Sequence, residues 1–242
     1  MLEFLDVSVR FGGLRALDGL SFSVREGEVL GMIGPNGSGK STAFNVISGT
    51  LAPDRGTVRF YDEDITALAP NRIAHKGIAR TFQVVRPFPH LSALDNVLAG
   101  RLFGGRGNKK SDATVAEAEA VLAMVGLAAK AHMKASSFTI LERKWLEVAR
   151  ALAGRPKLIL LDEFMAGISA SEIPDAVAFV SSINVSGVTV VLVEHIVKAI
   201  TGACHRVIVL DAGRKLAEGS VDEVFNDPTV IEAYLGSRHA GR

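Results

Sequence analysis

The chain has 242 residues, 48% of them hydrophobic, with 27 basic and 26 acidic residues. This length suits one large or two small domains, and the balanced charge argues against a broad basic surface for nucleic acid. The single cysteine, Cys204, excludes an intrachain disulfide. We expect it to be a buried apolar residue of a protein from a reducing compartment.

The sequence carries no sign of a membrane-embedded chain. Residues 1–6 carry acids where a secretory leader has bases, so we expect no leader. No apolar run approaches about 18 residues, so we expect no bilayer span. Any membrane role would then be peripheral, through a partner.

The amino-terminal third alternates short apolar strands with glycine turns. We predict strands over residues 5–11, 20–24, 29–33 and 57–61, and a helix over residues 42–48. The third strand is wholly apolar and leads directly into a glycine-rich loop.

That loop, residues 34–42, fits G-x-x-x-x-G-K-[ST] between a strand and a helix. Glycines let backbone N–H groups crowd around phosphate oxygens, and the following helix adds the positive end of its dipole. We expect Lys40 at the β- and γ-phosphates and Ser41 on Mg²⁺. An ordinary glycine turn is the alternative, which Lys40 and Ser41 disfavour. The candidate nucleotide-binding residues here are Gly34, Asn36, Gly37, Ser38, Gly39, Lys40, Ser41 and Thr42.

Strand signals vanish between residues 92 and 155, where helices are predicted over residues 113–125 and 146–152 around a glycine-rich basic linker. We interpret residues 92–155 as a helical insert in one α/β domain made of residues 1–91 and 156–242. Strands return at residues 158–161, 188–193 and 207–210, followed by a turn at residues 211–213. Ser220 and Glu223 form a capping-box pattern that opens a short helix, and a last helix follows at residues 230–235.

Two further segments place chemistry at strand ends. Asp162 and Glu163 follow the buried strand at residues 158–161, where Asp162 can hold Mg²⁺ and Glu163 can orient and deprotonate an attacking water. Solvated acids capping a strand are the alternative. His195 follows the next apolar strand and can hydrogen-bond the γ-phosphate or the water, although a satisfied structural histidine is the usual alternative.

Two candidates have weaker signals. Gln83 follows a short strand, and its amide could reach Mg²⁺ and the attacking water. Phe11 could stack on an adenine, a contact worth about 1–3 kcal/mol, or it could belong to a hairpin core.

These parts, in this order, resemble the ATP-binding subunit of ABC transporters over nearly the whole chain. Residues 34–41 match Walker A, residues 160–163 match Walker B with its catalytic glutamate, and Gln83, His195 and Phe11 match the Q-loop, the switch histidine and the adenine-stacking position. The resemblance implies an α/β fold: a P-loop NTPase core with an antiparallel β subdomain and a helical insert. It also implies ATP and Mg²⁺ as ligands, and ATP hydrolysis that powers transport.

Narrower segments, at residues 10–14, 79–83, 146–150, 193–195 and 230–236, resemble the branched-chain amino-acid importers. Urea and amide importers are close relatives, and the lipopolysaccharide-export ATPase shares part of the pattern. A soluble ABC ATPase of DNA repair or translation competes with the transport interpretation, as does an inactive structural homologue. The resemblance implies membrane permease subunits, a second ATPase subunit and, indirectly, a solute-binding protein as partners. It places the protein in the cytoplasm, on the inner face of the cell membrane, without nucleic acid.

Three segments depart from the family pattern. Residues 138–142 read Phe-Thr-Ile-Leu-Glu where the signature is Leu-Ser-Gly-Gly-Gln, so we expect weaker stabilisation of a partner's ATP, with Glu142 adding negative charge near an anion. Residues 168–170 lack the usual carboxylate or amide, and Phe164 replaces a proline. We therefore expect a heterodimer with a different ATPase subunit. We interpret the basic stretch of Arg101, Arg106, Lys109 and Lys110 as a solvated loop.

Overall fold

The computed structural model describes residues 1–82, 85–104 and 111–235. The chain forms two compact units, one of Met1–Pro70 with Ala170–Arg242 and one of Asn71–Ser169. Gln83 and the basic residues Arg106, Lys109 and Lys110 lie outside the described residues. Among the helices that the structure describes, none is both long enough and apolar enough to cross a membrane.

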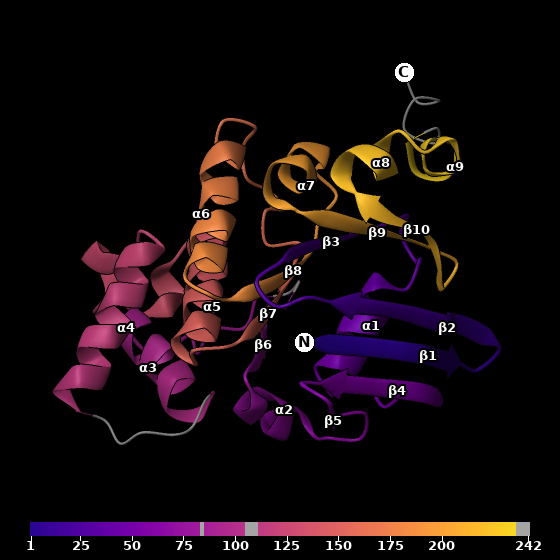
Figure 1. Ribbon diagram of the computed structural model, residues 1–242. Coiled ribbons are helices and arrows are strands. Elements are labelled where there is room, and N and C mark those ends of the chain that lie inside the picture. The colour runs from indigo at the N-terminus through magenta and orange to yellow at the C-terminus, as the bar shows by residue number, and fades with distance from the viewer. Residues whose placement is uncertain (83–84, 105–110, 236–242) are drawn as a thin grey trace. The chain divides into compact units, whose positions relative to one another are not determined.

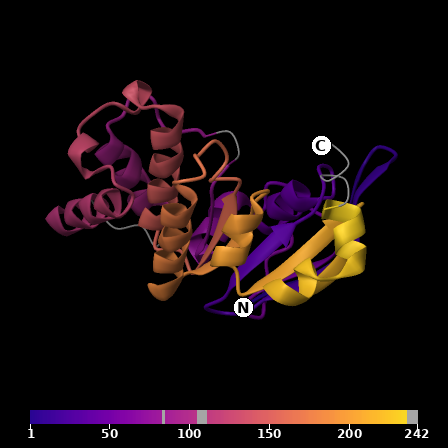
Figure 2. The same cartoon turned by 90° about the horizontal axis from the view of Figure 1, so that it is seen from above.

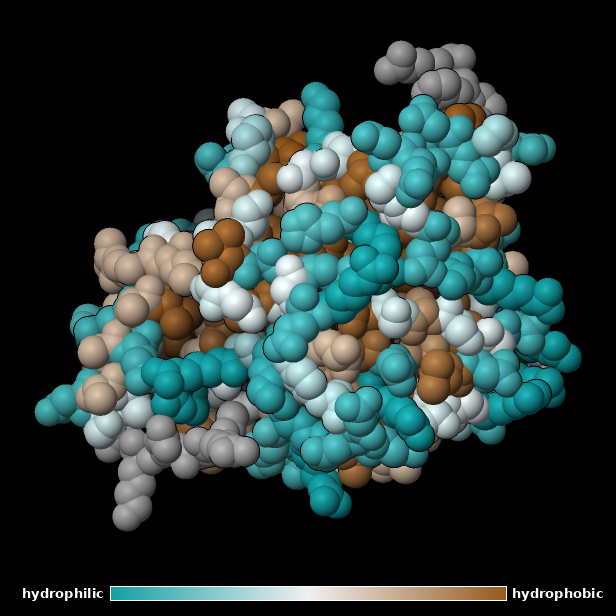
Figure 3. All heavy atoms as spheres, viewed as in Figure 1, coloured by the Kyte–Doolittle hydropathy of each residue, from teal (hydrophilic) through white to brown (hydrophobic). Residues whose placement is uncertain are grey.

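The first unit contains a four-stranded antiparallel sheet with the strand order β2-β1-β4-β5 (Figure 1). Its strands are β1 (Leu2–Phe11), β2 (Leu14–Val24), β4 (Arg55–Phe60) and β5 (Glu63–Asp64). Phe4 and Phe22 stack on its buried face with ring centroids 5.0 Å apart. On the molecular face drawn in Figure 3, hydrophilic side chains predominate, with smaller hydrophobic areas among them.

Strand β2 begins earlier than the sequence pattern predicts. A tight turn at Gly12 and Gly13 pairs Phe11 directly with Leu14, so the hairpin starts there. The register shifts after Phe4 and again around Val9. Because these irregularities interrupt the two-residue alternation, the first half of β2 has no clear strand signal.

The first unit also contains the wholly buried strand β3 (Val29–Ile33), which lies between two parallel neighbours. These are β8 (Thr189–Val193) and β9 (Arg206–Asp211), and β10 (Arg214–Ser220) pairs antiparallel with β9. Continuous apolar runs are the pattern of strands covered on both faces. Parallel pairing brings the carboxyl ends of β3 and β8 to the same edge of the sheet.

The first unit also contains helices from both ends of the chain. They are α1 (Lys40–Ile47), α6 (Ile173–Val185), α7 (Val197–Ala203), α8 (Val221–Phe225), α9 (Pro228–Val230) and a π-helix (Ile231–Leu235). The predicted capping box of Ser220 and Glu223 is present at the start of α8. Helices α8 and α9 lie beside the β9–β10 hairpin in both ribbon views (Figures 1 and 2).

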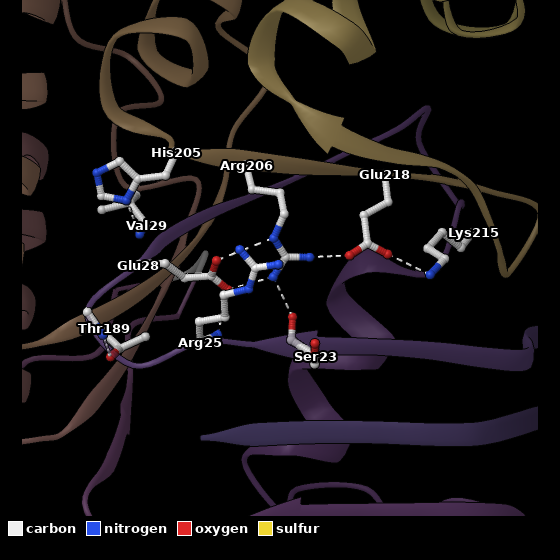
Figure 4. A network of polar contacts seen from close by, with 10 residues as sticks. Ser23, Arg25, Glu28, Val29, Thr189, His205, Arg206, Lys215 and Glu218 are labelled. Atoms are coloured by element: carbon white, nitrogen blue, oxygen red, sulfur yellow. Dashed lines mark hydrogen bonds and ion pairs between the residues drawn. The ribbon is translucent and has the colours of Figure 1, made fainter.

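One guanidinium joins both sheets of the first unit (Figure 4). Arg206, at the start of β9, donates to both carboxylate oxygens of Glu28, at 3.3 and 2.6 Å, and to the carbonyl of Ser23 in β2 at 2.7 Å. It also pairs with Glu218 in β10, which accepts a further bond from Lys215 at 2.6 Å. The Arg206 and Glu28 side chains are only 12% and 9% exposed, so their interaction is weakly screened by solvent.

The second unit combines a pair of parallel strands with a helical block. The strands are β6 (Ile78–Arg80) and β7 (Leu158–Asp162), and helix α2 (Pro70–Lys76) precedes them. The block contains α3 (Ala93–Phe103), α4 (Asp112–Met124), two 3₁₀ turns (Ala128–Lys130 and Ala135–Ser137) and α5 (Ile140–Ala153). Helix α3 packs against both α4 and α5.

The interpretation of Arg101 as part of a solvated loop is wrong. Arg101 lies on α3, is 5% exposed, and its Nε donates to Glu117 Oε2 of α4 at 2.6 Å. Two residues sixteen positions apart meet because α3 and α4 pack together, so the pairing has no signal in the local sequence.

Candidate active site

The glycine-rich loop between β3 and α1 curls around the side chain of Lys40. This lysine is 6% exposed, and its Nζ donates to the carbonyls of Gly34 and Pro35, both at 2.9 Å. It also donates to Ser38 Oγ at 3.3 Å. The ammonium group is therefore held inside the loop by the loop's own backbone, which is where the motif needs a cation.

Two glycines of this loop admit no other residue. A Cβ on Gly34 would lie 2.1 Å from the carbonyl oxygen of Leu210, and one on Gly39 would lie 2.7 Å from the carbonyl oxygen of Ala16. Gly39 also has a φ of +107°, which L side chains rarely adopt. The loop therefore packs directly against the end of β9 and against β2.

Helix α1 begins without a side-chain cap, as α6 and α7 also do. Helices α3, α4, α5 and α8 each begin with a Ser or Thr side chain that accepts a first-turn N–H. Helix α1 begins at Gly39, which offers no such cap. Its first-turn N–H groups, with the positive dipole end, are suited to an anion. All the predicted nucleotide residues from Gly34 to Thr42 lie in this loop or in the first turn of α1.

His195 lies level with this loop on the neighbouring strand. Met32 of β3 pairs with Val193 of β8, and Gly34 and His195 each follow their strand's paired residue by two positions. His195 is partly exposed. The fold thus places residue 195 at the same edge of the sheet as the beginning of the phosphate loop.

Phe11 is at the tip of the β1–β2 hairpin, and 52% of its surface is exposed. The interpretation of Phe11 as a hairpin-core residue is therefore disfavoured. Its ring is open to a flat ligand, and β2 contacts the phosphate loop at Gly39.

The two acidic candidates lie in the second unit. Asp162 is the last residue of β7 and is 3% exposed. Its Oδ2 accepts a hydrogen bond from Arg80 Nη2 at 3.0 Å, and its backbone N–H donates to Thr81 Oγ1 at 3.1 Å. The guanidinium of Arg80 thus offsets the negative charge of the buried Asp162 carboxylate. The sequence pattern did not indicate this partner.

Glu163 stands at the start of a tight turn. Its φ is +49°, in the left-handed region, and the N–H of Ala166 donates to its carbonyl at 3.1 Å. Lys144 of α5 donates to the carbonyls of Ala166 and Glu163 at 2.5 and 3.4 Å. Phe164 packs edge-on against Trp145, with ring centroids 5.7 Å apart. Asp162, Glu163 and Lys144 help line one small pocket of this unit.

Helix α5 also contacts Arg86 and Phe88, which lie between β6 and α3. Arg150 Nη1 donates to the carbonyl of Arg86 at 2.9 Å, and its guanidinium lies 5.3 Å from the centroid of the Phe88 ring. Glu147 is 2% exposed and pairs with Arg150 at 3.5 Å. Burial raises the pKa of Glu147, while Arg150 and hydrogen bonds from the backbone N–H groups of Phe82 and Arg86 partly offset that shift.

The segment that departs from the family signature opens α5 with a capping box. Thr139 Oγ1 accepts the N–H of Glu142 at 3.2 Å, and Glu142 Oε2 accepts the N–H of Thr139 at 2.9 Å. The other oxygen of Glu142 binds Lys130, which lowers the pKa of Glu142 together with Thr139. The negative charge that we expected near an anion thus has a cationic partner in its own unit. Ile140 is 72% exposed.

A family model described as "ABC transporter" matches residues 17–166, more than half of the chain. The chain belongs to the ABC transporter family. It is an ATPase of the ATP-binding cassette type, with the α/β fold that the resemblance implied. A second model, described as "Branched-chain amino acid ATP-binding cassette transporter", matches residues 214–240 of this ABC cassette.

Curated relatives align with the ABC cassette from end to end. The high-affinity branched-chain amino acid transport ATP-binding protein BraF of Pseudomonas aeruginosa is 35% identical, with 98% of each chain covered. A probable branched-chain amino acid transport ATP-binding protein LivG of Methanocaldococcus jannaschii is 36% identical, with 93% of each covered.

Solved structures share the same architecture. The ADP conformation of an ATP-binding cassette of an ABC transporter is 34% identical and superposes with a TM-score of 0.87 over 98% of both chains. A bacterial ABC transporter cassette described as dimeric is 26% identical, with a TM-score of 0.84 over 91% of this chain and 99% of the other.

Proposed function

We propose that this ABC cassette binds the triphosphate of ATP at the Lys40 loop and hydrolyses it with Glu163 as the residue that activates water. The observation that carries the proposal is the loop itself: a buried ammonium group, glycines with no room for a Cβ and a helix start without a side-chain cap. His195, level with Gly34 on the next strand, would hydrogen-bond the γ-phosphate or the water. Phe11 would stack on the adenine and Gln83 would contact Mg²⁺ and the water.

The donor set suits Mg²⁺ held jointly with ATP. Among the described residues, no three His, Cys, Asp or Glu side chains gather as a metal site. Mg²⁺ commonly takes one or two protein oxygens and completes its shell with phosphates and water. Ser41 and Asp162 would supply those oxygens. The bound cation would offset charge on the transferring phosphoryl group, while Lys40 holds the β- and γ-phosphates and Glu163 takes a proton from the water.

We further propose that this ATPase powers import of branched-chain or related amino acids. The match of residues 214–240 to a branched-chain amino acid cassette model supports this choice, as do the names of the curated relatives. The membrane permease subunits would hold the cassette at the cytoplasmic face, with the surface around residues 84–89 in contact with them. A solute-binding protein would supply the amino acid from the other side.

The altered signature segment supports pairing with a different ATPase subunit. The side chains of Thr139 and Glu142 each accept a hydrogen bond from the other residue's backbone N–H. Ile140 adds an exposed side chain where the glycine of the family signature would leave space. In a heterodimer, the ATP bound here would meet an intact signature on the partner. Steady-state hydrolysis with and without the candidate partner tests this, because full activity of the isolated chain alone would contradict it.

The variant Glu163→Gln tests the hydrolytic role. It keeps the size and polarity of the side chain but removes the base, so ATP binding should persist while turnover nearly disappears. Glu119→Gln, an exposed carboxylate on α4, is the matched control. Unchanged turnover in Glu163→Gln would remove Glu163 from this role.

The transport role requires the complete assembly. The cassette should co-purify with integral membrane subunits, and proteoliposomes containing the assembly should take up leucine, isoleucine or valine only with ATP inside. Uptake of urea or an amide instead would correct the substrate class. Association with a membrane complex that moves no solute inward would contradict import.

A further inference from the structure

The turn that carries Glu163 is held in an unusual backbone conformation. Glu163 has a φ of +49°, which residues other than glycine seldom adopt because their Cβ approaches the backbone. The hydrogen bond from Ala166 N–H to the Glu163 carbonyl closes the turn. Such a conformation persists only where surrounding contacts enforce it.

Lys144 supplies such contacts from α5. Its Nζ reaches the carbonyls at both ends of the turn, Ala166 at 2.5 Å and Glu163 at 3.4 Å. A hydrogen bond from an ammonium group to a carbonyl is stronger than one between neutral groups. One side chain therefore spans residues 163 and 166 from outside the turn.

The next residue of α5 secures the middle of the turn. Trp145 meets Phe164 edge to face, and Phe164 is 5% exposed although it directly follows a partly exposed glutamate. A proline at position 164 would fix its own φ through its ring. Phenylalanine has no such restraint on its backbone, so we assign that restraint to the packing of Phe164 on Trp145.

We propose that Lys144 is a positioning residue that sets where the Glu163 carboxylate stands, with the Trp145–Phe164 contact as its support. The proposal rests on the role proposed above for Glu163. Lys144 and Trp145 lie within two turns of the capping box at Thr139, on the same helix.

The test measures ATP binding and turnover separately in the assembled transporter. Lys144→Met keeps the length and apolar stem of the side chain but removes the donor, so kcat should fall about tenfold through misplacement of Glu163, with the Kd for ATP unchanged within about twofold. Lys144→Arg should restore most of kcat because it can donate to both carbonyls. Lys134→Met, which removes an exposed lysine of the same unit, should behave as wild type.

Fluorescence supplies a readout that does not depend on turnover. Trp145 is the only tryptophan in the chain. Its emission should change in Lys144→Met and return in Lys144→Arg, because the turn that carries Phe164 is released and then held again. The free energy of unfolding should change little in either variant.

The results for the Lys144 and Glu163 variants separate the positioning role from the proposed function. Wild-type kcat in Lys144→Met, or equal losses in ATP binding, stability and kcat that Lys144→Arg does not repair, would overturn the positioning role. Glu163→Gln separates this result from the parent proposal. If Glu163→Gln still hydrolyses ATP, the proposed function fails; if it is inactive while Lys144→Met turns over normally, only the present inference fails.

Discussion

Thr139 and Glu142 each accept a hydrogen bond from the other's backbone N–H at the start of α5. In the family signature this position carries glycines, which leave backbone N–H groups open to a ligand. In this chain the N–H groups of Thr139 and Glu142, on either side of the two positions where the signature has glycines, are satisfied within the helix start. The altered segment is therefore a stable helix start, which explains how it can depart from the signature without disturbing the fold.

The ion pair between Glu142 and Lys130 makes the free energy of unfolding depend on pH. The hydrogen bond from Lys130, with those involving Thr139, lowers the pKa of Glu142 from its ordinary 4.5. The stabilisation is present above that ordinary value and is lost as the pH falls through the lowered one. Glu142→Gln should cost about 0.5 kcal/mol at pH 7, since the pair is partly exposed. In urea titrations the difference from wild type should shrink below pH 4.5; a difference that grows in acid would contradict this assignment.

Gly34 should be irreplaceable for nucleotide binding. In Gly34→Ala the new Cβ would meet the backbone carbonyl of Leu210 at 2.1 Å, so the loop must shift away from β9. We expect ATP affinity to fall by about 100-fold or more, since a displaced loop misdirects several N–H donors at once. Equilibrium binding of a fluorescent ATP analogue measures it. Gly13→Ala, where nothing lies within 4 Å of the new Cβ, should bind normally.

Arg206 should be the most costly arginine of the first unit to remove. Arg206→Ala leaves Glu28 buried without its guanidinium partner and frees the Ser23 carbonyl, so the free energy of unfolding should fall by about 3 kcal/mol. Arg206→Lys should recover part of this loss, because one ammonium cannot reach all three partners. Chemical denaturation measures both. Arg72→Ala, at an exposed position of α2, should change stability by less than about 0.5 kcal/mol.

The single cysteine should be chemically inert in the folded protein. Burial, and to a lesser extent the charge of Glu194, raises the pKa of the Cys204 thiol to about 12. Since the thiolate is the reactive form, iodoacetamide should label Cys204 only after denaturation. Mass spectrometry of native and urea-treated samples distinguishes the two states. Rapid labelling of the native protein at pH 8 would show that the thiol is accessible.

The phosphate loop was predictable because its function depends on a contiguous pattern. The apolar strand, the glycines and Lys40 follow one another within a dozen residues, and the prediction that Cys204 is buried is confirmed. The partners of the acidic residues were not predictable in the same way. Arg80 lies 82 positions from Asp162 and Lys144 lies 22 positions from Ala166, so only the folded chain brings them together.

Helix α5 shows a different reason why the bounds of a helix predicted from the sequence can be wrong. The Thr-x-x-Glu pattern at residues 139–142 is the same kind of signal as Ser220 with Glu223, which was recognised. The sequence pattern predicts a helix from residue 146, but α5 begins at Ile140, because the Thr-x-x-Glu capping pattern stands where the family has a glycine-rich signature. Helix α6 was not predicted because Glu172, the residue before it, makes no side-chain cap. Pro174 in its first turn is itself a signal for a helix start, and it would have indicated this helix.

The position of β3 between β8 and β9 has a consequence for synthesis on the ribosome. Strand β3 emerges early, yet both of its neighbours are translated more than 150 residues later. During that interval a fully apolar strand lacks its final pairing, while the β1–β2 hairpin can already close. The nascent chain should therefore need protection from aggregation, and the anion-binding loop should reach its working shape only near the end of translation.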